Sequence, residues 1–125
     1  MTASFKESQK AIVNPRGILT KANESVDLFC KAPAGDSGLS LCLWEITGFS
    51  LQVKVVVYKG RIQNEGQASV EGISLTGDGM EAGKCGVRIH ALKQKHFGDW
   101  NCTLVTLAGS IFKGQASIID GNYSQ

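Results

Sequence analysis

The sequence predicts an all-β fold built as an antiparallel β-sandwich, and three observations support this. Apolar and polar residues alternate along most segments, as in Val26, Leu28 and Cys30, which is the period of a strand with one buried face. Turn-forming residues separate these segments at 59–60, 77–79 and 108–109. Only residues 92–97 could form a helix, and that stretch is too short to be stable alone.

The composition is that of an ordinary soluble domain. A length of 125 residues fits one domain, which we expect to span residues 9–120 between flexible ends at 1–8 and 121–125. The formal net charge of +2 does not favour a nucleic acid or an anionic membrane as partner. No apolar run is long enough to span a membrane. The polar start contains no signal peptide, so in a secreted protein the signal has been removed.

The cysteines favour disulfide bonds in an extracellular setting. Their number is even and no C-x-x-C spacing occurs, so the pattern indicates neither a metal site nor another cofactor. The four are Cys30, Cys42, Cys85 and Cys102. N-glycosylation sequons agree with secretion, and they begin at Asn23, Asn101 and Asn122.

The segment from Cys85 to Cys102, CGVRIHALKQKHFGDWNC, carries the most specific pattern. It resembles the E–F segment of immunoglobulin domains, L-x-I-x-x-V-x-x-x-D-x-G-x-Y-x-C. The apolar positions are taken by Val87, Ile89 and Leu92, whereas Gly98 and Cys102 match directly. Upstream, Cys30 and Trp44 complete the Cys–Trp–Cys order of the family. The resemblance covers residues 9–119.

The resemblance implies an immunoglobulin-like sandwich of the variable or intermediate type. The 42 residues between Trp44 and Val87 suffice for strands C′ and D, with or without C″, and this length favours these types over the shorter constant type. It also implies an inter-sheet disulfide between Cys30 and Cys102 with Trp44 packed beside it. Within this fold Cys42 shares the inward face of Trp44, and Cys85 that of Val87, which predicts a second inter-sheet disulfide. Two buried free thiols are the alternative.

Two residues depart from the family pattern. His96 stands where the usual Asp accepts backbone hydrogen bonds, and we expect it, like His90, to be solvated and to form no comparable bond or ion pair. Trp100 stands at the tyrosine-corner position, where its indole N–H can replace the hydroxyl. The predicted core includes Trp44, Trp100, Val87, Ile89 and Leu92.

The remaining candidate for function is a surface. No nucleophile motif or phosphate loop is present, so we expect no enzyme activity and assign no catalytic residue. An apolar outward row on the C and C′ strands indicates a partner-binding site, unless flanking loops or an adjacent domain cover it. This row contains Leu41, Leu43, Val56 and Tyr58.

The sequence therefore predicts an extracellular recognition or cell-adhesion domain, either secreted or at the cell surface. It would bind a protein partner, a second copy of itself included, through the C–C′–F–G face. Two alternatives stay open, namely a secreted immune effector that binds microbial or glycan ligands and a structural spacer domain of a longer ectodomain. The fold does not choose among them.

Overall fold

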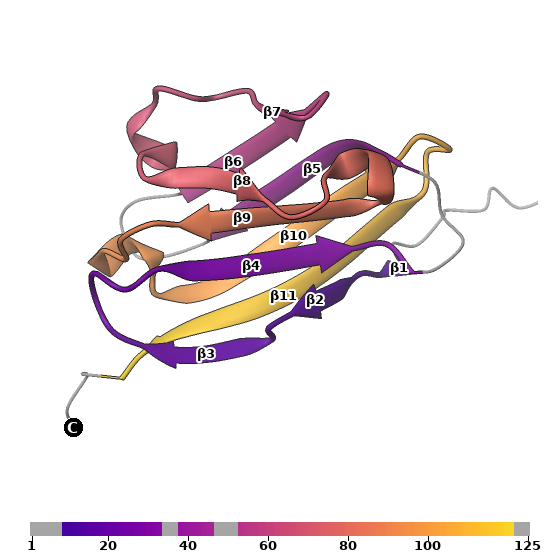
Figure 1. Ribbon diagram of the computed structural model, residues 1–125. Helices are drawn as coiled ribbons and strands as arrows, with labels where there is room; N and C mark the ends of the chain where they lie inside the picture. The colour runs from indigo at the N-terminus through magenta and orange to yellow at the C-terminus, as the bar shows by residue number, and fades with distance from the viewer. Residues whose placement is uncertain (1–8, 34–37, 47–52, 122–125) are drawn as a thin grey trace, which may run out of the picture.

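Two β-sheets pack face to face in the computed structural model, which describes residues 9–33, 38–46 and 53–121 (Figure 1). The larger sheet has the order β1-β11-β10-β5-β6-β7 with β3 also beside β11, and the smaller has the order β2-β4-β9-β8. The larger sheet contains β1 (Gln9–Lys10), β3 (Gly17–Thr20), β5 (Leu39–Ile46), β6 (Val53–Tyr58), β7 (Arg61–Ile62), β10 (Gly98–Thr106) and β11 (Ile111–Asp120). The smaller contains β2 (Ile12–Asn14), β4 (Val26–Lys31), β8 (Ile73–Thr76) and β9 (Lys84–Ile89). The predicted all-β sandwich is confirmed.

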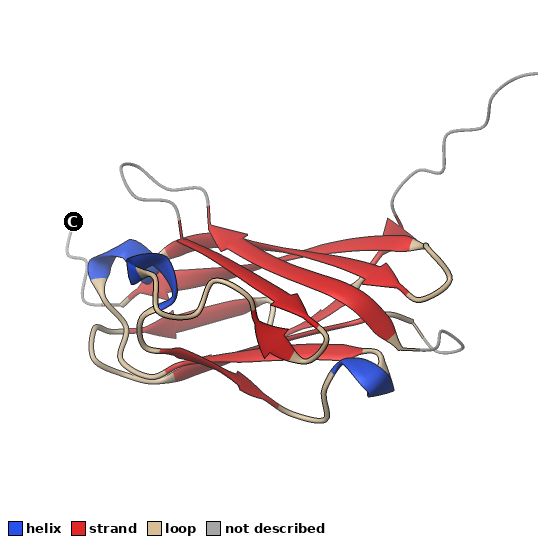
Figure 2. Ribbon diagram, turned by 90° about the horizontal axis from the view of Figure 1, so that it is seen from above, coloured by secondary structure: helices blue, strands red, loops and turns tan. Residues whose placement is uncertain are grey.

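Alternating burial explains why these segments are strands. Along β10 the side chains of Trp100, Cys102 and Leu104 are buried, and the residues between them are partly exposed. The same alternation runs along β5 and β6. Short 3₁₀ turns lie at the two ends of the sandwich (Figure 2), at Ala68–Val70, Met80–Ala82 and Gln94–His96. The last of these is all the helix that the segment 92–97 forms.

Two disulfides tie the sheets together. Cys30 on β4 bonds to Cys102 on β10, and Cys42 on β5 bonds to Cys85 on β9, with Cα atoms 6.6 and 6.4 Å apart. Cys30 and Cys85 are opposite each other in register, and Cys42 lies one inward position from Trp44. The predicted pair of inter-sheet disulfides is therefore confirmed, and the two bridges are neighbours in the core.

The core surrounds these bridges. The side chains of Trp44, Trp100, Val87, Ile89 and Leu92 are fully buried, and all belong to one apolar cluster. Trp44 is opposite Cys102 in the β5–β10 register, so its ring lies beside the first disulfide. The two disulfides and both tryptophan rings thus lie together in one buried cluster between the sheets.

The prediction that His96 is solvated was wrong. The side chain is only 1% exposed, and its ring stacks on that of Trp100 with centroids 6.3 Å apart. The expectation that it makes no comparable bond was also wrong, because Nδ1 accepts a hydrogen bond from the backbone N–H of Lys93 at 2.9 Å. A neutral imidazole offers an acceptor nitrogen and an apolar ring, and both are used here. Trp100 Nε1 donates to the carbonyl of His96 at 2.8 Å, so the indole closes the corner as predicted.

The N-terminal segment changes sheets twice. β1 pairs with β11, β2 joins β4 in the smaller sheet, and β3 returns to β11 after a cis Asn14–Pro15 peptide. Between β5 and β9 the chain forms β6, β7 and β8, which occupy the places of C′, C″ and D. Of the predicted flexible ends 1–8 and 121–125, only Gly121 is among the described residues, and it donates its backbone N–H to the carbonyl of Thr20.

Candidate protein-binding face

Four neighbouring strands of the larger sheet turn side chains to solvent in straight rows. Leu41 is opposite both Tyr58 and Val105, and Val105 is opposite Ile111, so these four residues form the first row. The second row contains Val56, Leu43, Thr103 and Lys113, and the third contains Lys54, Glu45, Asn101 and Gln115. We define the apolar face as the first row together with Val56, Leu43 and Thr103.

The apolar face lies directly over buried core side chains. Tyr58 and Ile111, at the ends of the first row, are 43% and 41% exposed, while the residues between them are partly buried by their neighbours. The inward residues of the same strands, such as Val55, are fully buried. At one rim the ammonium group of Lys59 lies 5.4 Å from the centroid of the Tyr58 ring. The face therefore presents hydrocarbon and one phenol with a cation beside it.

The chain itself closes the sheet edge next to this face. β7 pairs only with Val57 and Tyr58. Further along, the Asn64 side chain donates to the carbonyl of Lys54 at 2.6 Å and accepts the N–H of Val56 at 3.3 Å. The N–H of Gln63 donates to the carbonyl of Val56 at 2.7 Å. These bonds occupy the backbone groups that an added strand would need at this edge.

The outer face of the smaller sheet is different in character. Its β4 and β9 residues pair as Asp27 with Arg88 and Phe29 with Gly86. Arg88 donates two hydrogen bonds to the Asp27 carboxylate, at 2.7 and 3.0 Å, which lower the pKa of Asp27. The Phe29 ring covers Gly86, where a Cβ would lie 2.8 Å from it. At the centre of this face the two charges therefore pair with each other, and the aromatic ring packs on the chain's own backbone.

The structure brings the four predicted partner-binding residues together. Leu41 and Leu43 on β5 lie beside Tyr58 and Val56 on β6. The sequence did not assign Ile111, because the alternation along β11 can start at either of two neighbouring residues. The register settles it, since Phe112 is 2% exposed and Ile111 turns outward.

Two predicted glycosylation sites fall in different surroundings. Asn23 is exposed in the turn before β4 with a φ of 74°, a conformation that asparagine tolerates better than most residues. Asn101 is partly buried in the middle of β10, in the third row. Asn122 lies outside the described residues.

The described residues contain no group of three His, Cys, Asp or Glu side chains able to hold a metal ion. Ser74 Oγ and His90 Nε2 are 2.8 Å apart, the closest approach to a nucleophile and its base. Within the described ranges, however, His90 makes no hydrogen bond to a carboxylate that would orient its ring. The described part of the chain also has no helix with the length and apolarity needed to cross a membrane.

Comparison with solved structures finds the same fold in two mouse proteins, one of them represented by its extracellular portion. The extracellular portion of mouse CD200RLa matches with a TM-score of 0.62 and 15% identity, over 83% of this chain and 54% of that one. Murine CRIg matches with a TM-score of 0.64 and 18% identity, over 89% and 96%. This chain thus spans about half of the first structure and nearly all of the second. No protein-family model matches the sequence, and no curated protein does.

These likenesses concern the fold and leave function open. Altogether 1393 solved chains match, and a fold so widely shared supports many roles. The strand order, the disulfide beside Trp44 and the closed corner at Trp100 agree with the immunoglobulin pattern. The chain has an immunoglobulin-like fold of the variable or intermediate type.

Proposed function

We propose that this chain is an extracellular recognition domain that binds a protein partner through the apolar face. The observation that carries the proposal is the pair of adjacent rows in which Leu41, Leu43 and Val56 lie side by side at the surface. Single exposed apolar residues are normal, but a contiguous apolar patch is typical of interaction sites. Lys54 and Glu45 in the third row would provide the polar rim that such sites have.

An extracellular location is supported by the sulfur chemistry. All four cysteines are paired in disulfides, which persist in oxidising compartments and are rare in the cytosol. The exposed sequon at Asn23 fits the same location. Because the described residues offer no metal cluster and no oriented nucleophile, binding rather than catalysis is the activity proposed.

The test is Leu43→Glu, with Thr76→Glu as the matched control. Leu43 lies at the centre of the apolar face, and Thr76 faces solvent on β8 of the smaller sheet. Each variant adds one carboxylate at a partly exposed position, so unfolding free energies should change by no more than about 1 kcal/mol. Fluorescent tetramers of each domain are applied to cells of the native host, and sedimentation measures self-association up to millimolar concentration.

We expect the unmodified domain to stain cells or to self-associate, Leu43→Glu to lose that binding, and Thr76→Glu to keep it. Self-association that Leu43→Glu abolishes identifies a second copy as the partner, whereas staining without self-association identifies a different protein. Equal losses in both variants, or no binding by the unmodified domain, would overturn the proposal.

A further inference from the structure

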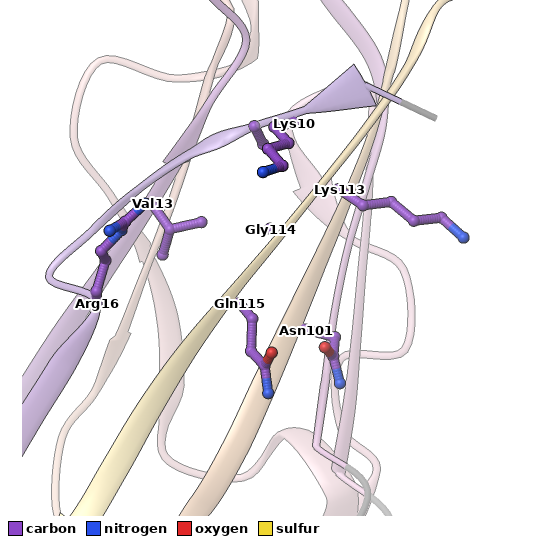
Figure 3. A pocket seen from close by; sticks show the side chains of 8 residues that line it. Lys10, Val13, Arg16, Asn101, Lys113, Gly114 and Gln115 are labelled. Carbon is purple, nitrogen blue, oxygen red and sulfur yellow. The ribbon is translucent and has the colours of Figure 1, made fainter. Parts of the chain in front are cut away.

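A pocket opens along β11 where the N-terminal segment leaves the larger sheet. Lys10 on β1 is opposite Lys113, and Gly17 on β3 is opposite Ser117, but β2 between them belongs to the smaller sheet. The resulting gap beside residues 114–116 holds a pocket of about 460 Å³. Its polar rim consists of Lys10, Arg16, Asn101, Lys113 and Gln115 (Figure 3).

The floor of the pocket depends on a glycine. Ala11, Val13 and Gly114 form it, and a Cβ on Gly114 would overlap the Val13 side chain. Glycine therefore allows β2 to cross close to β11 on its way to the smaller sheet. The gap is a consequence of this crossing.

The pocket also exposes backbone groups. The carbonyl of Lys113 accepts the N–H of Ala11, and the N–H of Ser117 donates to Arg16, so both residues direct their backbone groups toward this edge. Gln115 lies midway between them and has the same orientation, because backbone groups alternate along a strand. No described residue hydrogen-bonds to the Gln115 backbone there, so the pocket offers one N–H donor and one carbonyl acceptor.

The side chains that line the pocket carry charge of one sign, and the nearby Asp99 carboxylate accepts a hydrogen bond from Ser117 Oγ at 2.7 Å. No acidic residue lines the pocket, and Lys10, Arg16 and Lys113 make no ion pair or side-chain hydrogen bond with the described residues. Glu45 is opposite Asn101 on the neighbouring strand, and Lys54 is opposite Glu45 in turn. In Figure 3, Lys10 and Arg16 lie to the left of β11, while Lys113 and Asn101 lie to its right. A ligand lying across β11 would therefore meet cations on both sides.

We propose that this pocket binds an acidic saccharide. Carboxylate or sulfate groups of the sugar would pair with Lys10, Arg16 and Lys113 through charge-assisted hydrogen bonds. Its hydroxyl groups, which both donate and accept, would bond to the amides of Asn101 and Gln115 and to the Gln115 backbone. The pocket volume suits a small ligand rather than a folded partner. The site uses the edge of β11 and does not depend on protein binding at the apolar face.

The experiment uses the domain made in a host that forms disulfides but adds no N-glycans, so that Asn101 is bare. Calorimetry compares a sulfated heparin-type tetrasaccharide, a hyaluronan tetrasaccharide, uncharged chitotetraose and tetraglutamate. We expect one or both charged saccharides to bind, more weakly as salt is added, and chitotetraose and tetraglutamate to bind far less. The hyaluronan arm separates carboxylate recognition from sulfate recognition.

Variants distinguish saccharide binding in the pocket from a general effect of net charge and from binding at the apolar face. Arg16→Glu and Lys113→Glu should each weaken saccharide binding at least roughly tenfold, since each replaces attraction by repulsion. Arg61→Glu makes the same charge change on β7, at the far edge of the sheet, and should leave binding intact. Leu43→Glu should also leave it intact, so this site and the apolar face can fail independently. Equal weakening by Arg61→Glu, equal affinity for tetraglutamate, or no binding of either charged saccharide at low salt would overturn the proposal.

Discussion

His96 is a titratable group held inside the core at the corner before β10. Its Nδ1 accepts the Lys93 N–H, so the ring proton lies on Nε2, which is buried and has no hydrogen-bond partner among the described residues. Burial, with Lys95 and Lys93 nearby, lowers the pKa of His96 from 6.5 to about 4. Protonation would also place a proton on Nδ1 facing the Lys93 N–H, so the folded state needs the neutral ring.

The domain should lose stability in mild acid because of this residue. Between pH 6.5 and about 4 the unfolded chain binds a proton at His96 and the folded chain does not, so stability falls as pH falls through that window. The loss should approach about 3 kcal/mol. His96→Asn keeps an acceptor for the Lys93 N–H but does not titrate, so its unfolding free energy should vary much less over the same window. Urea titrations at a series of pH values measure both proteins.

A separate acid effect belongs to Asp27 and provides the control. Arg88 lowers the pKa of Asp27 below its ordinary value of 3.8, so the stability it contributes is present above that value and is lost only at lower pH. Asp27→Asn should therefore leave the slope between pH 6.5 and 4 unchanged. An unaltered slope in His96→Asn would show that His96 titrates normally.

Single residues differ in how far the sequence reveals them. Trp100 could be placed at the closed corner because its spacing from Cys102 matches a family pattern, and its N–H is a suitable donor. The burial of His96 could not be predicted, because histidine is usually polar surface in a turn. Its role depends on the 3₁₀ turn that brings the Lys93 N–H to Nδ1. The sequence indicates a short helical stretch at 92–97 but not that the His96 ring turns inward there.

Long strands are predictable, whereas short ones are not. β5 and β10 have 8 and 9 residues, which is long enough for the apolar–polar alternation to show which residues face the core. Alternation along β5 placed Cys42 on the inward face of Trp44, and alternation along β9 placed Cys85 on that of Val87, which correctly predicted their disulfide. β1, β2 and β7 have 2 or 3 residues, too few to show a period, and the pocket at Lys10 depends on two of them.

Removing the second disulfide should loosen the sandwich without unfolding it. The double variant Cys42→Ala and Cys85→Ala removes a disulfide that joins residues 43 positions apart. Because the unfolded chain then gains conformational freedom, the free energy of unfolding should fall by about 2 to 4 kcal/mol. The bridge between Cys30 and Cys102 still joins β4 to β10, so the far-ultraviolet spectrum should stay that of a β-protein. Chemical denaturation measures the loss.

The first disulfide provides the comparison. Its closure of 72 positions is longer, so replacing Cys30 and Cys102 by alanine should cost about 0.5 kcal/mol more in the loop-entropy picture, if strain and packing are equal. Unchanged stability in the Cys42 and Cys85 double variant would mean that this bridge does not constrain the unfolded chain.

On the scale of the whole molecule, different binding chemistries occupy different parts of the larger sheet. The apolar face covers the first row and most of the second, and the basic pocket lies at the β11 edge, where Lys113 ends the second row and Gln115 ends the third. The smaller sheet turns an internal ion pair between Asp27 and Arg88 to solvent. Asn101 lies between the apolar face and the basic pocket. Whether it carries a glycan therefore decides whether both sites can bind.

Asn23 should therefore carry a glycan in the native host, and Asn101 should not. Asn23 is exposed in a turn away from both proposed sites, whereas Asn101 is partly buried mid-strand beside Cys102, whose bridge to Cys30 competes with access to the sequon. Intact-mass measurement should show Asn23→Gln losing one glycan and Thr103→Val, which removes the second sequon while keeping Asn101, losing none. A mass decrease in Thr103→Val would place a glycan over the pocket and against the apolar face. Both proposed sites would then be covered in the native protein, and its partner would have to bind elsewhere.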